Sequence, residues 1–502
     1  MVNPLARSVT ALLGSLAVAL TLGAAPAAPV DPAGPPAPGT SARVAGVDDL
    51  AAMAAAYGRI TGPGGQLRNP AYLPALVQAT SALTVAQLVA QAATPSRLAL
   101  TAGNVVPGWN VGNPLRAGWH GTRGLARRVA FTNRYGALLQ GTVHRPLPGA
   151  RDPYTGQRLR PPFPGVVLTP GSVQGSEGMY SWLAQDLAER GYVVLTFDVQ
   201  GQGRGETLPH TTSNALPFCN PFAAPRDGEQ LGCPGVPFQQ LANFVVGTED
   251  AVDFFTSTAA LPYRNPGSAG ARIDTHNPFA RWLDRRRDPR AAAGRPMRLA
   301  IIGHSLGAQA VSRVQGTDRR VATVVALDKL AGGDGDPAVR PRVPALAVQS
   351  EYGFTVTPAA LSGGSSLVPT PTPAGPDPRR ERSAGFDRWA AAGVDSLLVV
   401  PRSSTHLEYT DIPLVLPASR YGQAVTSVYV QRWLDLQLKH RGSPRALLAP
   451  RLRYLEPRGS GRWAPVTLRA GDQLSTRYCS AYRLTDRRGR VATEGDLMGA
   501  GC

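Results

Sequence analysis

The chain has few charged residues, almost no lysine and only four cysteines. Of its 502 residues, 17% are charged and 43% are hydrophobic. This balance excludes a disordered chain, because such chains have too little apolar surface to form a core. The 55 glycines and 47 prolines exclude a long coiled coil, since both residue types interrupt helices. The length suits one large domain with appendages, or two domains.

Positive charge exceeds negative charge, with 52 Lys plus Arg against 34 Asp plus Glu and a formal net charge of +18. The only lysines are Lys329 and Lys439, so arginine carries nearly all of this charge. The basic residues are scattered apart from a short run between Arg281 and Arg290, and no zinc-ligand spacing, helix-turn-helix pattern or aromatic-basic alternation accompanies them. We therefore expect no nucleic-acid partner. Loose attraction to an anionic cell surface or lipid is compatible with the charge.

Residues 1–28 have the layout of a secretory signal peptide. Arg7 precedes an apolar stretch at Val9–Gly23, and small residues follow at Ala24–Ala28. The apolar stretch is short for a membrane span, which needs about 20 residues. The Pro/Gly-rich residues 29–43 indicate a flexible linker. We expect a secreted or cell-envelope protein with no later segment long and apolar enough to span a membrane.

Export makes disulfide bonds plausible, because the extracellular space is oxidising. The cysteines form two pairs that are close in sequence, Cys219 with Cys233 and Cys479 with Cys502. Four cysteines allow three pairings, so these two disulfides are predicted from proximity alone. The spacings do not match those of a metal site.

The chain changes pattern along its length. Residues 44–127 are rich in Ala and Leu at helical spacing, which predicts a helical preface. The segment Arg128–Pro146 alternates, turns at Asn133–Gly136 and alternates again, which predicts an antiparallel hairpin. From Phe163 onward, short apolar runs alternate with amphipathic helix-length segments. The fold class is therefore α/β, with a mostly parallel sheet covered by helices on both faces.

The α/β region is expected to span residues 128–443. Its expected strands are Gly165–Leu168, Tyr192–Phe197, Leu299–Ile302, Val321–Leu327, Val343–Val348 and Ser396–Val400. Three loop-rich insertions interrupt it, and long loops after strand ends often cover a site: residues 201–237, 261–295 and 357–378. The Arg-rich, strand-like residues 444–502 predict either a small appended module or an arm packed on the main domain.

The most informative motif is G-x-S-x-G at Gly303, Ser305 and Gly307. An apolar strand enters it and a helix with small residues leaves it. This strand–turn–helix context holds a serine in a tight elbow with its hydroxyl exposed, and the glycines avoid collisions with neighbouring backbone. We therefore predict that Ser305 is a nucleophile.

A serine hydroxyl needs a base to take its proton, and in this elbow an acid and then a histidine follow the serine along the chain. His406 is the one histidine between Ser305 and the last expected helix, and it follows an expected strand at the edge where the site should lie. We predict that His406 is the general base.

Two carboxylates compete for the role of the acid. Asp328 and Glu351 each come at the end of an expected strand, and either could hold the imidazole in the right tautomer. Glu351 follows the strand more often used for this role, whereas Asp328 is the more usual residue type. We favour Glu351 and keep Asp328 as the alternative, the other carboxylate being a supporting group or a cap.

An acyl-transfer site also needs two backbone N–H donors for the oxyanion. One is expected from Leu306, directly after the nucleophile. The other is expected from the Gly-rich loop at Thr169–Gly175, where Ser172 or Val173 can supply it.

In their order along the chain, these motifs resemble those of the α/β-hydrolase family. Residues 128–440 carry the hairpin, the Pro170–Gly171 loop, the turn from Asp198 to Gly203, the serine elbow and His406 in that family's order. The resemblance implies acyl transfer to water through an acyl-serine, with no metal and no organic cofactor.

The segment Pro164–Asp198 is similar to bacterial polyester hydrolases and cutinase-like lipases, and the mature chain looks like a group of secreted bacterial α/β hydrolases. It departs from the polyester hydrolases at their acid. When Pro344 is aligned with the start of their corresponding strand, Gly353 falls at the acid position. Polyester specificity is therefore not carried over.

Three functions are compatible with these residues. The first is a secreted carboxylic ester hydrolase acting on a small-molecule, lipid or polymeric ester. The second is a serine peptidase or amidase, which shares the triad but must protonate an amine leaving group. The third is a non-catalytic cell-envelope binding protein on a hydrolase scaffold, which the basic charge, the preface and the tail would suit. The complete set of nucleophile, base and candidate acids favours the ester hydrolase.

Overall fold

A computed structural model describes residues 45–502 except for 98, 100, 102–103, 105, 107, 173–174, 207–240, 289–296, 334–335, 358–360, 362–370, 372–375, 416–417 and 487–489. The predicted signal peptide, the linker, the Cys219–Cys233 pair and Val173 lie outside the described residues.

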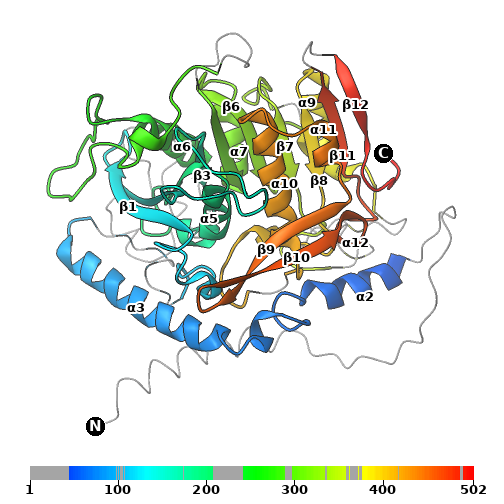
Figure 1. Cartoon of the computed structure of the whole chain (residues 1–502), viewed down its shortest axis with the longest axis horizontal. Helices are drawn as coiled ribbons and strands as arrows, with labels where there is room; N and C mark the ends of the chain where they lie inside the picture. The colour runs from blue at the N-terminus through cyan, green and yellow to red at the C-terminus, as the bar shows by residue number, and fades with distance from the viewer. Residues whose placement is uncertain are drawn as a thin grey trace.

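The centre of the molecule is a 10-stranded sheet in the order β1-β2-β4-β3-β5-β6-β7-β8-β11-β12 (Figure 1). The strands are β1 (Gly124–Thr132), β2 (Leu138–Pro146), β3 (Gly165–Thr169), β4 (Val193–Phe197), β5 (Leu299–His304), β6 (Val321–Leu327), β7 (Ala345–Val348), β8 (Ser396–Val399), β11 (Ala481–Thr485) and β12 (Val491–Asp496). Every pair from β4–β3 to β7–β8 is parallel, and the pairs at both ends are antiparallel. The α/β expectation is confirmed.

The parallel strands are buried along their whole length, which explains why they are uninterrupted apolar runs. Alternate residues face opposite sides of the sheet. In β3, Val166 and Leu168 belong to one hydrophobic cluster and Val167 to the other.

Helices cover both faces of this sheet. One cluster contains residues of α6 (Leu241–Thr256), α7 (Leu306–Val314) and α9 (Asp387–Ala391). The other contains residues of α5 (Ser181–Glu189) and α10 (Gly422–Gln437), together with the separate hairpin of β9 (Arg451–Gly459) and β10 (Arg462–Arg469). Each face of the sheet therefore has its own core.

The C-terminal residues complete the main sheet. Strand β11 pairs with β8 in antiparallel fashion, and β12 follows β11 at the sheet edge. The short helices α11 (Pro444–Leu447) and α12 (Ala470–Gln473) flank the β9–β10 hairpin. Of the two expected arrangements for 444–502, the structure has the packed arm.

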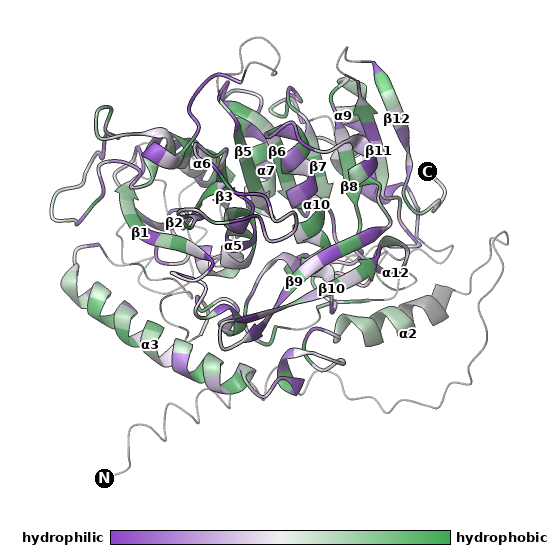
Figure 2. Cartoon of the chain, viewed as in Figure 1, coloured by the Kyte–Doolittle hydropathy of each residue, from purple (hydrophilic) through white to green (hydrophobic). Residues whose placement is uncertain are grey.

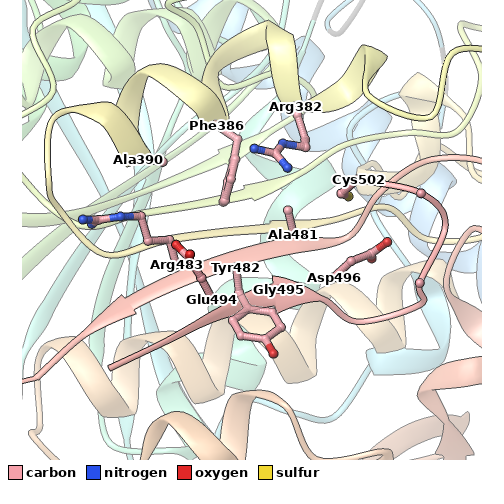
Figure 3. Close-up of a pocket in the computed structure, with 12 residues that line it drawn as sticks. Arg382, Phe386, Ala390, Ala481, Tyr482, Arg483, Glu494, Gly495, Asp496 and Cys502 are labelled. Atoms are coloured by element: carbon pink, nitrogen blue, oxygen red, sulfur yellow. The ribbon is translucent and has the colours of Figure 1, made fainter. Parts of the chain in front are cut away.

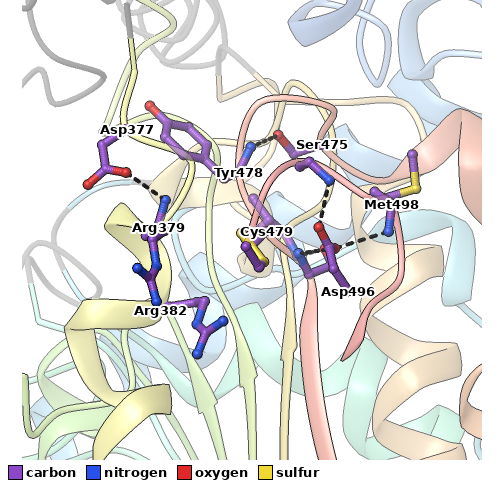
Figure 4. Close-up of a disulfide and its surroundings, with 12 residues drawn as sticks. Asp377, Arg379, Arg382, Ser475, Tyr478, Cys479, Asp496 and Met498 are labelled. Carbon is purple, nitrogen blue, oxygen red and sulfur yellow. Dashed lines mark hydrogen bonds between the residues drawn. A yellow bond between two sulfur atoms is a disulfide. The ribbon is translucent and has the colours of Figure 1, made fainter. Parts of the chain in front are cut away.

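The predicted Cys479–Cys502 disulfide is present and closes a loop with a sequence separation of 23. Figure 4 shows this bond beside Asp496, whose carboxylate accepts hydrogen bonds from the Ser480 and Met498 backbone N–H groups. The bond and these contacts hold the end of the chain against the start of β11.

In the described residues before β1, two long helices precede the sheet. Helix α2 (Ala45–Ala56) packs on Tyr352 and Val356, and α3 (Tyr72–Ala93) packs beside the short 3-10 helices η1 (Gln66–Arg68) and η2 (Pro114–Arg116).

The expectation that no later segment could span a membrane is wrong for α3. By length and composition alone α3 could do so, with a mean hydropathy of 1.4 over an 18-residue window that is only 17% buried.

Candidate active site

Ser305 lies at the turn between β5 and α7, where the sheet presents the carboxyl ends of its parallel strands. Its backbone has φ 56° and ψ −121°, a conformation that side chains rarely adopt. The turn is possible only because two neighbours lack side chains. A Cβ on Gly303 would lie 2.1 Å from the Gly307 carbonyl oxygen, and one on Gly307 would lie 2.3 Å from that of Pro170. The local geometry is that of a nucleophile elbow.

His406 begins the 3-10 helix η7 (His406–Tyr409), in the loop that follows β8. Its Nε2 lies 3.0 Å from Ser305 Oγ, within hydrogen-bond distance. The backbone N–H of His406 donates to the Gly353 carbonyl at 2.9 Å, and the Phe354 ring lies 4.7 Å from the imidazole, centroid to centroid. The loop after β7 therefore fixes both the backbone and the ring of the predicted base.

The carboxylate on the other side of this imidazole is Asp328, at the end of β6. Nδ1 of His406 lies 2.7 Å from Asp328 Oδ2, and the Ser350 hydroxyl donates to the same oxygen at 2.7 Å. Burial by itself raises the pKa of Asp328, but the hydrogen bond and charge of His406, the Lys329 ammonium and the Ser350 hydrogen bond bring it well below its ordinary value. Asp328 is therefore held as a carboxylate.

The sequence favours Glu351 as the acid, but the carboxylate that contacts His406 is its alternative, Asp328. Both carboxylates end neighbouring strands, but Glu351 points to the C-terminal arm. It accepts hydrogen bonds from the Ser403 backbone N–H and from the Ser475 hydroxyl, the latter at 2.6 Å. Burial raises the pKa of Glu351, and these bonds partly oppose the rise. Glu351 thus links the loop that carries His406 to the arm.

Leu306 and Gly171, the neighbour of Ser172, lie on either side of the elbow; Val173 is outside the described residues. Leu306 is the first residue of α7, and the first N–H groups of a helix have no acceptor within it. Gly171, beside the half-buried Ser172, approaches the serine so closely that a Cβ on Gly171 would lie 3.1 Å from Ser305 Cβ. The Gly-rich loop after β3 therefore reaches the nucleophile, as expected.

Two residues that the sequence analysis did not select connect this loop to the base. The Tyr180 hydroxyl accepts the Gly171 N–H at 2.9 Å and lies 2.7 Å from His304 Nδ1. His304 Nε2 in turn lies 2.9 Å from the His406 carbonyl oxygen. Burial, followed by the charge of His406, lowers the pKa of His304 to about 3. A neutral His304 can accept from Tyr180 and donate to His406. No pattern in the sequence marks Tyr180, which is 124 positions before His304.

Metal ligation is not indicated at the one group of candidate ligands found among the described residues. Cys479, Asp496 and Cys502 have ligand atoms within 4.8 Å of one another. Both cysteines are engaged in the disulfide, so no thiolate is available.

A cavity of about 540 Å³ lies near this disulfide. Figure 3 shows Arg382 and Phe386 on one wall and Tyr482 and Glu494, from β11 and β12, on the other. None of Ser305, His406 and Asp328 is among the residues that line it. It is separate from the serine site.

No family model and no curated protein matches the chain. Among solved structures, the chain is similar to a ferulic acid esterase from Streptomyces cinnamoneus, with a TM-score of 0.35 and 18% sequence identity over 64% of this chain and 91% of that one. A likeness of this degree carries no argument about function, so the proposal below depends on the geometry of the chain's own residues.

Proposed function

We propose that this chain is a secreted serine hydrolase of the α/β-hydrolase fold that cleaves carboxylic esters. The observation that carries the proposal is the continuous contact from Ser305 Oγ to His406 Nε2 at 3.0 Å and from His406 Nδ1 to Asp328 Oδ2 at 2.7 Å. The chain order serine, acid, histidine and the elbow between strand and helix support the fold assignment.

In the proposed reaction, Ser305 Oγ attacks the ester carbonyl while His406 takes its proton. Asp328, held as a carboxylate, stabilises the imidazolium that forms. The Leu306 N–H and a donor in the loop at Ser172 stabilise the oxyanion. His406 then protonates the leaving alkoxide, and an acyl-serine remains. Water, deprotonated by His406, releases the acid and restores Ser305.

Export is part of this proposal. The N-terminal layout of residues 1–28 supports it, and the Cys479–Cys502 disulfide is compatible with an oxidising compartment. N-terminal sequencing of protein recovered from the culture medium tests it, and the expected first residue follows Ala25, Ala27 or Ala28.

The deciding experiment is labelling with a fluorophosphonate probe, which reacts with activated serines whatever the substrate. We expect the wild type to be labelled at Ser305, labelling to disappear in Ser305→Ala, and labelling to fall sharply in His406→Ala. The matched control is Ser383→Ala, because Ser383 is an exposed serine on the surface. A folded wild type that is not labelled contradicts the proposal.

Turnover of matched ester and anilide substrates by the same proteins separates the ester hydrolase from the amidase. We expect the ester to be preferred, because its alkoxide leaves more readily than an amine. Faster turnover of the anilide would assign the site to amide hydrolysis.

A further inference from the structure

Helix α3 has an orientation that is unusual for a helix of a water-soluble protein. Its 22 residues include no charged side chain. Its buried residues are Tyr72, Leu76, Thr80 and Gln87, so two of the four that it turns toward the protein are polar. A surface helix in water normally buries most of its large apolar side chains.

The outer face of α3 is apolar. Its large side chains are between 45% and 64% exposed: Leu73, Val77, Val85, Leu88 and Val89. Figure 2 shows α3 as a mostly hydrophobic helix at the edge of the molecule, on the side of β1. Gln78 and Ser81 of α3 are exposed as well, but exposed apolar surface of this kind marks a site of interaction, because leaving it in water costs free energy.

The inner side of α3 lies near residues that follow the loop after β3. Small side chains of α3, including Ala82 and Ala86, line a cavity of about 390 Å³ together with Ser176 and Gly178. These residues follow the loop that begins beside the nucleophile, since a Cβ on Gly171 would lie 3.1 Å from Ser305 Cβ. Helix α3 thus lies across a cavity from the segment that begins at Ser176, five positions after Gly171.

The net charge of the protein, and not a local cluster of cations at α3, favours an anionic partner. Arg128 of β1 and Arg204 line the same cavity. Burial, followed by the charge of Arg204, lowers the pKa of Arg128, and Glu177 only partly opposes this effect. Arg204 is already paired with the buried carboxylates of Glu177 and Asp198, and Glu177 lines the same cavity, so this cavity does not itself select an anion. The whole chain has a net charge of +18, which attracts anionic surfaces over a longer range.

We propose that the outer face of α3 is a docking surface for anionic lipid membranes, on which the helix lies in the interface with its apolar side chains among the acyl chains. An uncharged helix with exposed Leu and Val, carried by a basic protein, has the two properties that interfacial binding requires. Docking would bring the segment that begins at Ser176 close to the lipid surface. The corresponding substrate class, a lipid ester, rests on the proposed ester hydrolase function. Binding of α3 to a membrane does not depend on that function.

The test uses full-length mature protein carrying Ser305→Ala, so that no lipid is hydrolysed. Flotation with vesicles of phosphatidylcholine plus phosphatidylglycerol is compared with flotation with phosphatidylcholine alone. The test variant combines Val77→Gln, Val85→Gln and Leu88→Gln, because Gln has nearly the helix propensity of Leu. The control combines Leu261→Gln and Val491→Gln, which change exposed apolar residues outside α3.

We expect the parent to bind the anionic vesicles, the control to bind equally, and the α3 variant to bind at least about tenfold more weakly, since each apolar side chain contributes through its buried area. Circular dichroism checks that the α3 variant is folded.

Three outcomes would overturn the proposal. These are equal vesicle binding by the α3 variant and the control, equal binding of the parent to both lipids, and no vesicle binding by the parent. A parent dimer that the α3 substitutions dissociate, without vesicle binding, would assign this face to a second copy of the chain. Fluorophosphonate labelling of the α3 variant with Ser305 intact tests the catalytic proposal separately.

Discussion

Asp328 and Glu351 are both buried carboxylates, but only Asp328 contacts His406. We predict that Asp328→Asn lowers kcat on an activated ester by about 10³-fold to 10⁴-fold, because an amide favours the wrong imidazole tautomer and cannot stabilise the imidazolium. Glu351→Gln should cost about tenfold or less, since it changes only the support of the His406 loop. Steady-state kinetics of the two folded variants measure the difference. A larger loss in Glu351→Gln than in Asp328→Asn would restore Glu351 as the acid.

The Tyr180 hydroxyl offers a second comparison at the scale of single atoms. Tyr180→Phe removes the acceptor of the Gly171 N–H and the partner of His304. We predict a fall in kcat of about tenfold with little change in KM, because a loosened oxyanion loop affects the transition state more than the bound ester. Tyr409→Phe is the matched control, since the buried Tyr409 hydroxyl has no hydrogen-bond partner in the described part of the chain. Equal effects of the two changes would contradict a positioning role for Tyr180.

At the scale of elements, the C-terminal arm supports the strand that leads to His406. The Ser480 hydroxyl accepts from the Val400 backbone N–H at 3.1 Å, and the Ser475 N–H donates to the Val400 carbonyl at 2.8 Å. Removing the disulfide loosens this support. We predict that Cys479→Ser with Cys502→Ser lowers the free energy of unfolding by about 3 kcal/mol, as expected for closing a loop of this length. Urea unfolding followed by tryptophan fluorescence measures it.

An unchanged unfolding midpoint in that double variant would mean that the arm stays in place without the bond. The control compares the wild type and the double variant after both are treated with a reductant: they should then be equally stable if the bond itself, and not the serine side chains, is responsible.

The elements that the sequence predicts well are those in which local pattern and burial agree. The strand expected at Val321–Leu327 has those bounds in the structure, because a strand covered on both faces is apolar at every position. The elbow at Ser305 follows from glycines that the backbone geometry requires.

The features that the sequence does not predict depend on contacts between distant segments. Asp328 and Glu351 both end strands, and only the path of the His406 loop decides which of them reaches the imidazole. The link from Tyr180 to His304 has the same origin. For α3, composition predicts a helix, but the exposure of its apolar side chains depends on how it packs against the rest of the molecule.

At the scale of the whole molecule, the segment after α2 meets the main domain at the loop that carries His406. Arg59, just after α2, donates to the Glu408 carbonyl at 3.1 Å, and its guanidinium lies 3.7 Å from the Glu408 carboxylate. Both residues are buried, and Glu408 lies two positions after His406. Because a buried carboxylate without a cation is costly, this pair ties the preface to the active site and not only to the surface of the domain.

The stability of the whole molecule in acid should depend on a buried histidine far from the triad in sequence. Burial lowers the pKa of His144, on β2, from 6.5 to about 4. The unfolded chain therefore binds a proton that the folded chain does not, so the stability that a neutral His144 contributes is complete above pH 6.5 and is lost as the pH falls toward about 4. We predict that the difference in unfolding free energy between wild type and His144→Gln shrinks by about 2 kcal/mol from pH 7 to pH 5, at about 1.4 kcal/mol per pH unit. His304 is present in both proteins and cancels. Urea titrations at the two pH values measure the difference, and a constant difference would mean that His144 keeps an ordinary pKa in the folded protein.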